Sequence, residues 1–496
     1  MDDNHTFANH LRYFSQIAFF LFLSAASAAA QVPTAGTRFT FAIPEGADNV
    51  SPGFPLTTKL KLIVVSPYDG DGVLYSPSGV EIPFSFRANT GLELDLPYKL
   101  MLLNDLGKTN KGVLVYTTQP VNLTLHFIAP YAGEATQIYP DGALGTDYLV
   151  SEWGVFNDPD ENNKTEIAVT AAEDNTNVTI TPTVRCLGGH PAKQAINVML
   201  NRGECFILKA DIDGLPNTIS LCRSTVRSSK PVSVLSALTC AYVPLGLEAC
   251  NPLLDHILPL NSADTVFYAS PPSAPDHKTR LLFISPQDTF YVLTTTGFVF
   301  QTQTGRIVLP MLQADKFITS APALCHQYVV GYEAYTFGDP AMTPVLPERY
   351  WIDTMLWYAP LIMNDANRFS HFVSVVFPTA NGNDVLLDGN PIATYPQVFP
   401  IASSTMSAAT VQIVEGIHRI TSTVPVFAIS SGFLPADAYT AVAMGRAPPI
   451  DYAAIPTSLA TNVSPAKTCK DFTVSVATVG DQDERRYSSL CAYRNV

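Results

Sequence analysis

A fourfold internal repeat constrains the fold of this chain more than any other feature of its sequence. In each repeat, a strand-like apolar run leads into a short polar stretch and then a proline followed by a small apolar residue. The four prolines are Pro120, Pro231, Pro322 and Pro425. They lie about 90 to 110 residues apart, which is enough chain for one compact unit of several strands. We therefore expect four similar units in tandem.

Each repeat has the pattern of antiparallel β-structure, because runs of β-branched and aromatic residues are broken by Pro, Gly and Asn. Opening strands are predicted at 37–42, 146–150, 265–269 and 355–359. Pairs of strands joined mostly by Asp- or Asn-containing turns follow at 60–67 and 72–75, 167–170 and 177–180, 281–284 and 289–293, and 372–377 and 384–387. The repeated proline is expected inside or just before a long strand, at an edge or bulge that needs no backbone N–H.

The predicted fold class is all-β, with four tandem antiparallel units of about 100 residues, each sandwich-like. Blades of a propeller-like ring are the alternative, because both architectures have short strands at regular spacing. The predicted units are 37–144, 145–263, 264–348 and 349–450, followed by a disulfide-closed tail at 451–496. A strand-like segment at 470–477 either closes a ring or caps the last unit.

Residues 1–30 are predicted to be a signal peptide. A short apolar run from Ile17 is followed by small residues ending in Ala28-Ala29-Ala30, the composition of a cleavage site. A membrane anchor is the alternative, but the run is shorter than the ~20 residues that a spanning helix needs. We therefore expect a secreted, extracellular chain that does not span the membrane once the signal peptide is removed.

Composition excludes one class of partner and suggests a modification. Only 15% of the residues are charged, against about 25% in ordinary soluble domains, and the net charge is −14. A negative chain is repelled by phosphate backbones, so nucleic-acid binding is not expected. Glycans can supply the missing surface polarity, and the candidate glycosylation sites are Asn49, Asn122, Asn163, Asn177 and Asn462.

Eight cysteines follow the predicted signal peptide, and none lies in a C-x-x-C pair that would suggest zinc binding or redox chemistry. Disulfides are therefore expected. Short spacing favours Cys240 with Cys250 and Cys469 with Cys491. The other disulfide candidates allow three pairings that the sequence does not distinguish, and they are Cys186, Cys205, Cys222 and Cys325. Buried free thiols are the alternative.

Catalytic motifs are sparse, since the sequence has no G-x-S-x-G, H-E-x-x-H or P-loop motif. Asp255-His256 could orient an imidazole base, but no nucleophile lies beside it, so we expect it to hydrogen-bond the Cys240–Cys250 loop. Acidic clusters at 69–71, 158–161, 211–213 and 481–484 could bind calcium, but none has EF-hand spacing, and turn residues are the simpler interpretation. We predict no catalytic residue, no metal and no cofactor.

Two more local features invite interpretation. Aromatic residues crowd one junction between units, and they are Tyr350, Trp351, Trp357 and Tyr358. We expect them to pack between units, with a binding surface for sugars or proteins as the alternative. The stretch Gly338-Asp339-Pro340-Ala341 is predicted to be a turn.

The second repeat resembles a known family. The similar stretches are 143–151, 171–182, 200–206, 228–234, 240–244 and 250–259. They resemble the N-terminal domain of IgGFc-binding proteins, and the repeat extends the similarity over roughly 37–435. The resemblance implies a secreted, mucus-associated or cell-surface protein that binds rather than catalyses. This chain has neither the length nor the cysteine density for the von Willebrand type D repeats of the vertebrate relatives, so binding to immunoglobulin Fc is not assumed.

Together these features predict a secreted, glycosylated, non-enzymatic binding or adhesion protein of mucus or extracellular matrix. Its expected partner is an extracellular protein or glycan. One alternative is a secreted carbohydrate-active hydrolase whose carboxylates meet at a junction between units. A structural matrix protein that associates with itself is another.

Overall fold

The computed structural model has two compact parts, residues 1–447 and 448–496, and each is described by itself. The residues that the structure describes are 34–46, 59–129, 132–156, 163–212, 218–244, 247, 250–272, 278–331, 338–361, 363–364, 367–435, 437–443 and 445, together with three strands of the second part. Those strands are β35 (Ala460–Asn462), β36 (Thr473–Ala477) and β37 (Tyr487–Ser488), which form one sheet. The predicted signal peptide lies outside the described residues.

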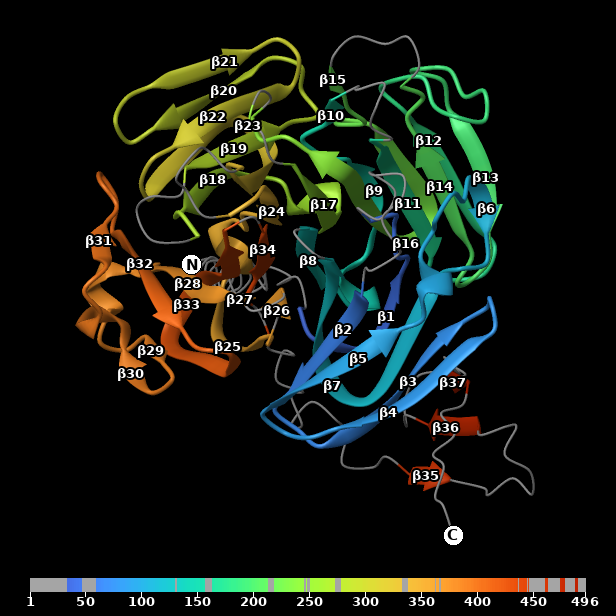
Figure 1. Ribbon diagram of the computed structural model, residues 1–496, viewed down its shortest axis with the longest axis horizontal. Helices are drawn as coiled ribbons and strands as arrows, with labels where there is room; N and C mark the ends of the chain where they lie inside the picture. Colours follow the sequence, from blue (N-terminus) through green and yellow to red (C-terminus); the bar gives the residue numbers. More distant parts are fainter. Residues whose placement is uncertain are drawn as a thin grey trace, which may run out of the picture. The chain divides into compact units, whose positions relative to one another are not determined.

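The first part confirms the predicted fold class, because it consists of four antiparallel sheets (Figure 1). The first sheet contains β1 (Gly36–Phe41), β2 (Lys59–Ser66), β3 (Gly70–Ser76), β4 (Val80–Phe86), β5 (Thr90–Leu96), β7 (Val113–Ala129) and β8 (Ala132–Ile138). The second contains β6 (Gly107–Thr109), β9 (Gly145–Leu149), β11 (Thr165–Ala171), β12 (Thr176–Thr181), β13 (Ile196–Leu200), β14 (Cys205–Lys209), β16 (Thr225–Ala241) and β17 (Asn251–His256). A small pair, β10 (Val155–Phe156) and β15 (Thr218–Ile219), accompanies it.

The third and fourth sheets repeat the same plan. The third contains β18 (Asp264–Ala269), β19 (Thr279–Ile284), β20 (Phe290–Thr294), β21 (Val299–Thr302), β22 (Arg306–Met311), β23 (Asp315–Val329) and β24 (Ala341–Pro344). The fourth contains β25 (Ile352–Ala359), β28 (Ser370–Pro378), β29 (Leu386–Leu387), β30 (Asn390–Pro391), β31 (Val398–Pro400), β32 (Met406–Ile413), β33 (Gly416–Leu434) and β34 (Asp437–Val442). A two-residue pair is formed by β26 (Met363–Asn364) and β27 (Asn367–Arg368). Apart from β6, which joins the second sheet from within the predicted first unit, the predicted unit boundaries fall between these sheets, and we keep them as a proposed division.

One long strand organises each sheet, and these strands are β7, β16, β23 and β33. The first half of each long strand pairs with the opening strand, and the second half pairs with a short last strand. The repeated proline lies between the two halves, where the pairing register to the opening strand shifts. This confirms the predicted bulge, because a proline without an N–H fits where the strand changes partners.

The four last strands, β8, β17, β24 and β34, meet at a common centre. Strand β8 contacts β17 and β34, and β24 contacts the same two strands, so the contacts close a ring. Figure 1 shows the four curled sheets placed around this centre. The four strands are almost entirely buried, and the centre is therefore a packed axis rather than a channel. Each curled sheet is a sandwich-like unit, as predicted, and the four units are arranged around one axis rather than in a row.

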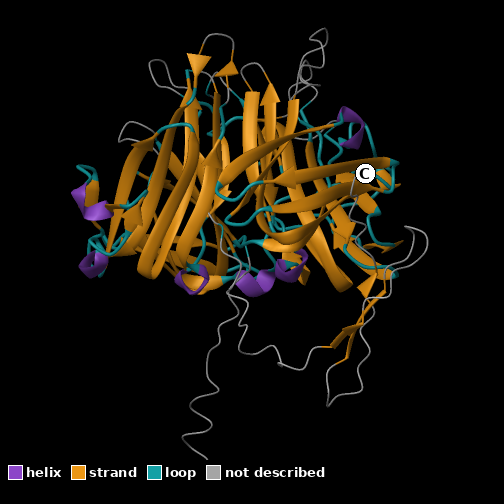
Figure 2. Cartoon of the chain, turned by 90° about the horizontal axis from the view of Figure 1, so that it is seen from below, coloured by secondary structure: helices purple, strands orange, loops and turns teal. Residues whose placement is uncertain are grey.

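Three of the described 3-10 helices connect one sheet to the next. Pro140, Pro259 and Pro347 immediately precede η3 (Asp141–Ala143), η4 (Leu260–Ser262) and η5 (Glu348–Tyr350). The others are η2 (Tyr98–Leu100), η6 (Thr379–Asn381) and η7 (Ile392–Thr394). Figure 2 shows most of these helices along one edge of the strands. The fixed φ of proline favours the start of such a helix, so a proline marks each passage from an inner strand to the next opening strand.

The ring is closed between the fourth and first sheets. Leu356 of β25 packs with Ile63 and Val65 of β2. Asn122 in β7 donates its side-chain N–H to the carbonyl oxygen of Leu356 at 3.4 Å. These residues are separated by more than 200 positions in the chain, so the closure is a purely tertiary contact.

Candidate functional site

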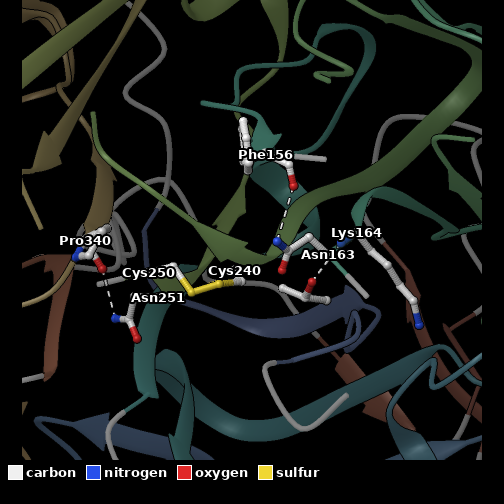
Figure 3. The surroundings of a disulfide bond; sticks show 8 residues. Phe156, Asn163, Lys164, Cys240, Cys250, Asn251 and Pro340 are labelled. Carbon is white, nitrogen blue, oxygen red and sulfur yellow. Dashed lines mark hydrogen bonds between the residues drawn. A yellow bond between two sulfur atoms is a disulfide. The ribbon is translucent and has the colours of Figure 1, made fainter. Parts of the chain in front are cut away.

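The predicted disulfide between Cys240 and Cys250 is present, with 5.2 Å between the two Cα atoms. It ties the end of β16 to the start of β17 (Figure 3). Asn251 follows Cys250 directly and is the first residue of β17. The disulfide therefore restrains the residue that enters the centre of the ring.

The other described cysteines do not form disulfides. Cys186, Cys205, Cys222 and Cys325 are free and buried, so the structure corrects the expectation that these four pair with one another. Burial raises the pKa of Cys186 and Cys205 to about 12, because the thiolate is poorly solvated there. These thiols are packed as small apolar groups. Cys469 and Cys491 lie outside the described residues, and their pairing stays a prediction.

Asn251 joins all four sheets at the axis. Its side-chain nitrogen donates to the carbonyl oxygens of Gly133 at 2.6 Å, Pro340 at 2.9 Å and Ala438 at 3.2 Å. These acceptors belong to the lead-in or first residues of β8, β24 and β34, and Figure 3 shows the bond to Pro340. One amide group thus bonds the backbone of the three other inner strands.

Acidic residues lie at or near the start of the other inner strands, namely Glu134, Asp339 and Asp437. The Glu134 carboxylate accepts the backbone N–H of Ala135 at 2.9 Å and of Met342 at 3.2 Å. Burial raises the pKa of Glu134 well above its usual value and that of Asp339 to about 7. Burial and the nearby Asp339 charge raise the pKa of Asp437. We call these three residues and Asn251 the axial cluster.

The axial cluster corrects one prediction. Residues 338–340 are not a turn, because Asp339 is buried and the chain runs directly into β24 at Ala341. The acidic residues of the axial cluster are carboxylates that meet at a junction between sheets, as the hydrolase alternative requires. However, Glu134, Asp339 and Asp437 are each 2% exposed or less, so a sugar polymer cannot reach them in this structure.

Asp255 and His256 point to different partners. Asp255 pairs with His326 of the third sheet at 2.8 Å, and both side chains are buried. His256 accepts the backbone N–H of Tyr139 at its Nδ1 and bonds the Ser233 hydroxyl through Nε2 at 3.0 Å. The proton therefore sits on Nε2, so the ring cannot take one from Ser233. The role is structural, as expected, but it links strands rather than the Cys240–Cys250 loop.

The aromatic residues at the last junction are core residues, as the packing interpretation predicts. Tyr350, Trp351 and Trp357 are buried, and Trp351 lies edge-on to Tyr268 and stacked with Phe427. Tyr358 is partly buried against Ile63 and Val65 of the first sheet. They join the third and fourth sheets and close the ring.

The described acidic clusters serve as turn or ion-pair residues. Asp69 accepts the backbone N–H of Ala88 at 2.7 Å, and Asp71 accepts the Ser85 hydroxyl at 2.7 Å. Asp211 pairs with Arg185. The clusters at 158–161 and 481–484, and Asp213, lie outside the described residues. Within the part of the chain that is described, no three His, Cys, Asp or Glu side chains are arranged to hold a metal ion.

Burial separates the candidate glycosylation sites. The Asn122 side chain is buried and accepts a hydrogen bond from Gln137 at 2.6 Å, and Asn163 is buried and donates to the carbonyl oxygen of Phe156 at 3.3 Å (Figure 3). Neither position has room for a glycan in the folded chain. Asn177 is exposed on β12, so it stays a predicted site. Asn49 and the side chain of Asn462 lie outside the described residues.

The outer face of the third sheet is unusually apolar. The residue four positions before each repeated proline pairs with residues of the neighbouring strands, and together they form a row across the sheet. In the third sheet the row is aliphatic, formed by Val266, Ile318, Leu293 and Val299. In the second sheet the matching row is Asp147, Arg227, Thr179 and Asn197. The matching row of the first sheet is Arg38, Tyr116, Val73 and Pro83, and that of the fourth sheet is Thr354, Thr421, Leu386 and Pro391.

Large aromatic residues border this row. Phe298 is 67% exposed and Val299 59%, and Tyr291 is exposed on the adjoining strand β20. We call Tyr291, Leu293, Phe298, Val299 and Ile318 the third-sheet face. A contiguous exposed apolar surface is typical of an interaction site.

Comparison with models of protein families shows which family this chain belongs to. The model of the family described as IgGFc binding protein matches residues 134–432, more than half of the chain. The chain belongs to the IgGFc-binding protein family. The family is one of extracellular binding domains rather than enzymes. A search of curated protein sequences finds no match.

The IgGFc-binding match covers the second sheet apart from β6, the third sheet and most of the fourth. It begins at Glu134 in β8, so the resemblance predicted from near residue 37 stays a prediction for the rest of the first sheet. The matched range contains the third-sheet face and all of the axial cluster except Asp437. No helix in the described part of the chain is long and apolar enough to cross a bilayer.

Sequence reasoning did not identify the axial cluster of this IgGFc-binding family member. Its residues lie 14, 20, 17 and 12 positions after the four repeated prolines, so no constant spacing reveals them. The available signal is positional, since each lies where the last short strand of a repeat begins.

Proposed function

We propose that this chain is exported and acts as a non-enzymatic binding or adhesion protein of mucus or extracellular matrix. The observation that carries the proposal is the third-sheet face, because it is an exposed aliphatic surface at a position that is polar or charged in the second repeat. The Cys240–Cys250 disulfide supports export, since disulfides persist in oxidising compartments.

The chemistry of this face favours a protein partner over a glycan. Leu293, Val299 and Ile318 offer no hydrogen-bonding group, and the Tyr291 hydroxyl is the one side-chain hydrogen-bonding group of the face, whereas a glycan presents many hydroxyls that need partners. Between Thr289 and Gly305 the chain has no charged residue, so no charged group of this segment has to lose its hydration when a partner docks there. We therefore assign the face to an apolar patch of an extracellular matrix protein.

A binding experiment with matched variants tests this assignment. The purified chain is mixed with the insoluble mucus or matrix fraction of its source and sedimented. We expect the wild-type chain to be retained and the V299T/I318T variant to bind at least about fivefold more weakly, which corresponds to about 1 kcal/mol. V414T is the control, because Val414 is 73% exposed but lies in the turn between β32 and β33, away from the third sheet.

Two results would contradict the proposal. Equal retention of wild type and V299T/I318T would remove the third-sheet face from binding. A decrease in the size of the matrix polymers during incubation would show that the chain is an enzyme. Retention with unchanged polymer size and loss only in V299T/I318T supports both parts of the proposal.

A further inference from the structure

The repeat gives the four sheets equivalent strands toward one edge, namely β5, β14, β22 and β32. The residue four positions after each repeated proline begins a pairing that crosses one strand and reaches one residue on each of these. The four equivalent residues are Glu93 of β5, Ile207 of β14, Val308 of β22 and Thr410 of β32. The four edges can therefore be compared position by position.

Two of these strands carry a further short strand at their outer side. In the second sheet, β6 comes from the preceding repeat and pairs with β14, and its Gly107 lies opposite Ile207. In the fourth sheet, β31 pairs with β32, and Thr410 donates its backbone N–H to the carbonyl oxygen of Gln397 at 3.2 Å. Both added strands have 3 residues. At this edge, the fold thus accepts a short extended segment.

The other two edges carry no added strand among the described residues. In β5, Glu93 and Asp95 form ion pairs with Lys61, and charged side chains are a common protection of a sheet edge against further pairing. In β22, the residues after Arg306 are apolar, and Val308 is 37% exposed. In the described part of the chain, the edge of β22 is therefore neither covered by a strand nor protected by charge along its length.

The backbone groups of Arg306 and Val308 point away from the third sheet. Ser285, which follows β19, donates its backbone N–H to the carbonyl oxygen of Gly305 at 3.0 Å, so the odd-numbered residues of β22 face β19. Successive residues of an antiparallel strand direct their N–H and C=O groups to opposite sides, so the even-numbered residues face outward. Pro310 fits this side because it has no N–H, and it limits further pairing to about three residues.

This edge adjoins the third-sheet face. Strand β21, which contains Val299 of that face, contacts β22 without pairing with it and is joined to it by residues 303–305. Val308 and Pro310 are exposed on one side of β22, and Leu312, which is 79% exposed, follows them. A partner docked on the third-sheet face thus meets unpaired backbone groups next to apolar side chains. Strand addition uses this combination, since main-chain bonds give affinity and side chains give specificity.

We propose that the edge of β22 binds a short extended apolar segment of the matrix-protein partner by strand addition. The segment lies on β22 as β6 lies on β14, and it hydrogen-bonds the backbone N–H and C=O groups of Arg306 and Val308. Its apolar side chains pack against Val308, as cross-strand neighbours do. This inference rests on the proposed function, because the partner is the protein assigned to the third-sheet face, and it describes how that protein is held.

The variant V308P tests strand addition. It removes the outward N–H and leaves the hydrogen bonds between β22 and β19 in place, because Val308 does not face β19. The full purified chain is sedimented with the insoluble mucus or matrix fraction of its source. We expect V308P to bind at least about fivefold more weakly than the wild-type chain, with an unchanged circular dichroism spectrum.

The matched control is a proline at another sheet edge, M199P. Met199 is 55% exposed in β13 of the second sheet. Its carbonyl oxygen accepts the Lys108 Nζ at 3.1 Å, so its backbone groups also point away from the neighbouring strand β12. M199P should therefore bind the matrix fraction as the wild-type chain does.

Hydrogen exchange of the wild-type chain gives a second measure that needs no variant. In the free chain, the amide of Val308 should exchange fast, whereas that of Ile207, which β6 covers, should exchange slowly. On binding to the matrix fraction, a peptide covering 306–311 should gain about two protected amides. A peptide covering 205–209 should gain none.

The outcomes separate this inference from the proposed function. If V308P binds as well as the wild-type chain, or no better protected amides appear at 306–311, strand addition is wrong, while a loss in V299T/I318T still supports the proposed function. Equal losses in V308P and M199P would also overturn it. Absence of wild-type retention contradicts the proposed function and this inference together. Should V308P not fold, hydrogen exchange of the wild-type chain decides the question.

Discussion

At the scale of single residues, Asn251 is the side chain on which the ring depends most directly. In N251D, a carboxylate oxygen replaces the nitrogen that donates to the carbonyls of Gly133, Pro340 and Ala438. Three acceptors then lose their donor and face a buried negative charge, which costs several kcal/mol. We expect N251D to lower the free energy of unfolding by at least about 3 kcal/mol in a urea titration.

The matched control for this prediction is N197D. Asn197 is exposed, and its side-chain oxygen accepts the Thr179 hydroxyl at 2.8 Å, which an aspartate can also do. A change of less than about 0.5 kcal/mol is expected there. Similar losses in the two variants would mean that the axial amide has no special role.

Buried histidines make the fold sensitive to acid. Burial lowers the pKa of His126 and His256 to about 3 and that of His371 to about 4. These rings are neutral in the folded chain, whereas in the unfolded chain they bind a proton below about pH 6.5. Their contribution to stability is therefore complete above pH 6.5. It is lost as the pH falls from 6.5 towards 3, by about 1.4 kcal/mol per pH unit for each ring.

The variant H256Q isolates one of these rings. Between pH 6.5 and 4.5, its free energy of unfolding should fall by about 2 to 3 kcal/mol less than that of the wild-type chain. Urea titrations of both proteins at the two pH values measure this difference. The buried carboxylates, whose raised pKa acts in the opposite direction, are common to both proteins and cancel. Parallel pH profiles would show that His256 is not the neutral ring described above.

At the scale of elements, strands were predictable and their ends less so. The opening strands predicted at 37–42, 146–150 and 265–269 each lie within one residue of β1, β9 and β18, because alternating apolar residues report one buried face. The strand predicted at 384–387 is reduced to Leu386–Leu387. Strand β25 begins three residues earlier than predicted, because pairing with β33 extends the strand through the polar Asp353.

The disulfide acts on one connection between two elements. It closes a loop of 10 residues between β16 and β17. Removing the cross-link from a loop of this size costs about 2 to 3 kcal/mol, mainly through the entropy of the unfolded chain. We expect the C240S/C250S variant to lose this amount in urea titration. Dithiothreitol should lower the stability of the wild-type chain and leave the variant unchanged, and an equal effect on both would assign the stability to another cross-link.

At the scale of the whole molecule, the sequence could not choose between a row of units and a ring. Both need the same strands and turns, so local patterns are the same. The deciding contacts join residues more than 100 positions apart, such as Asn251 with Gly133 and Asn122 with Leu356. The axial cluster was hidden for the same reason, since its members come together only when all four repeats surround one axis.

Ring closure makes a prediction at Gly91 of β5. A side chain there would overlap the ring of Tyr358 in β25 of the fourth sheet. In a ring, G91A therefore crowds a packed contact, at a cost of about 1 to 3 kcal/mol. In a row of units, position 91 has no such neighbour, and replacing a strand glycine by alanine would be neutral or favourable. A double-mutant cycle with Y358A distinguishes these outcomes by urea titration. We expect G91A to cost at least 1 kcal/mol less in the Y358A background, whereas an equal effect in both backgrounds would mean that the fourth sheet does not close onto the first.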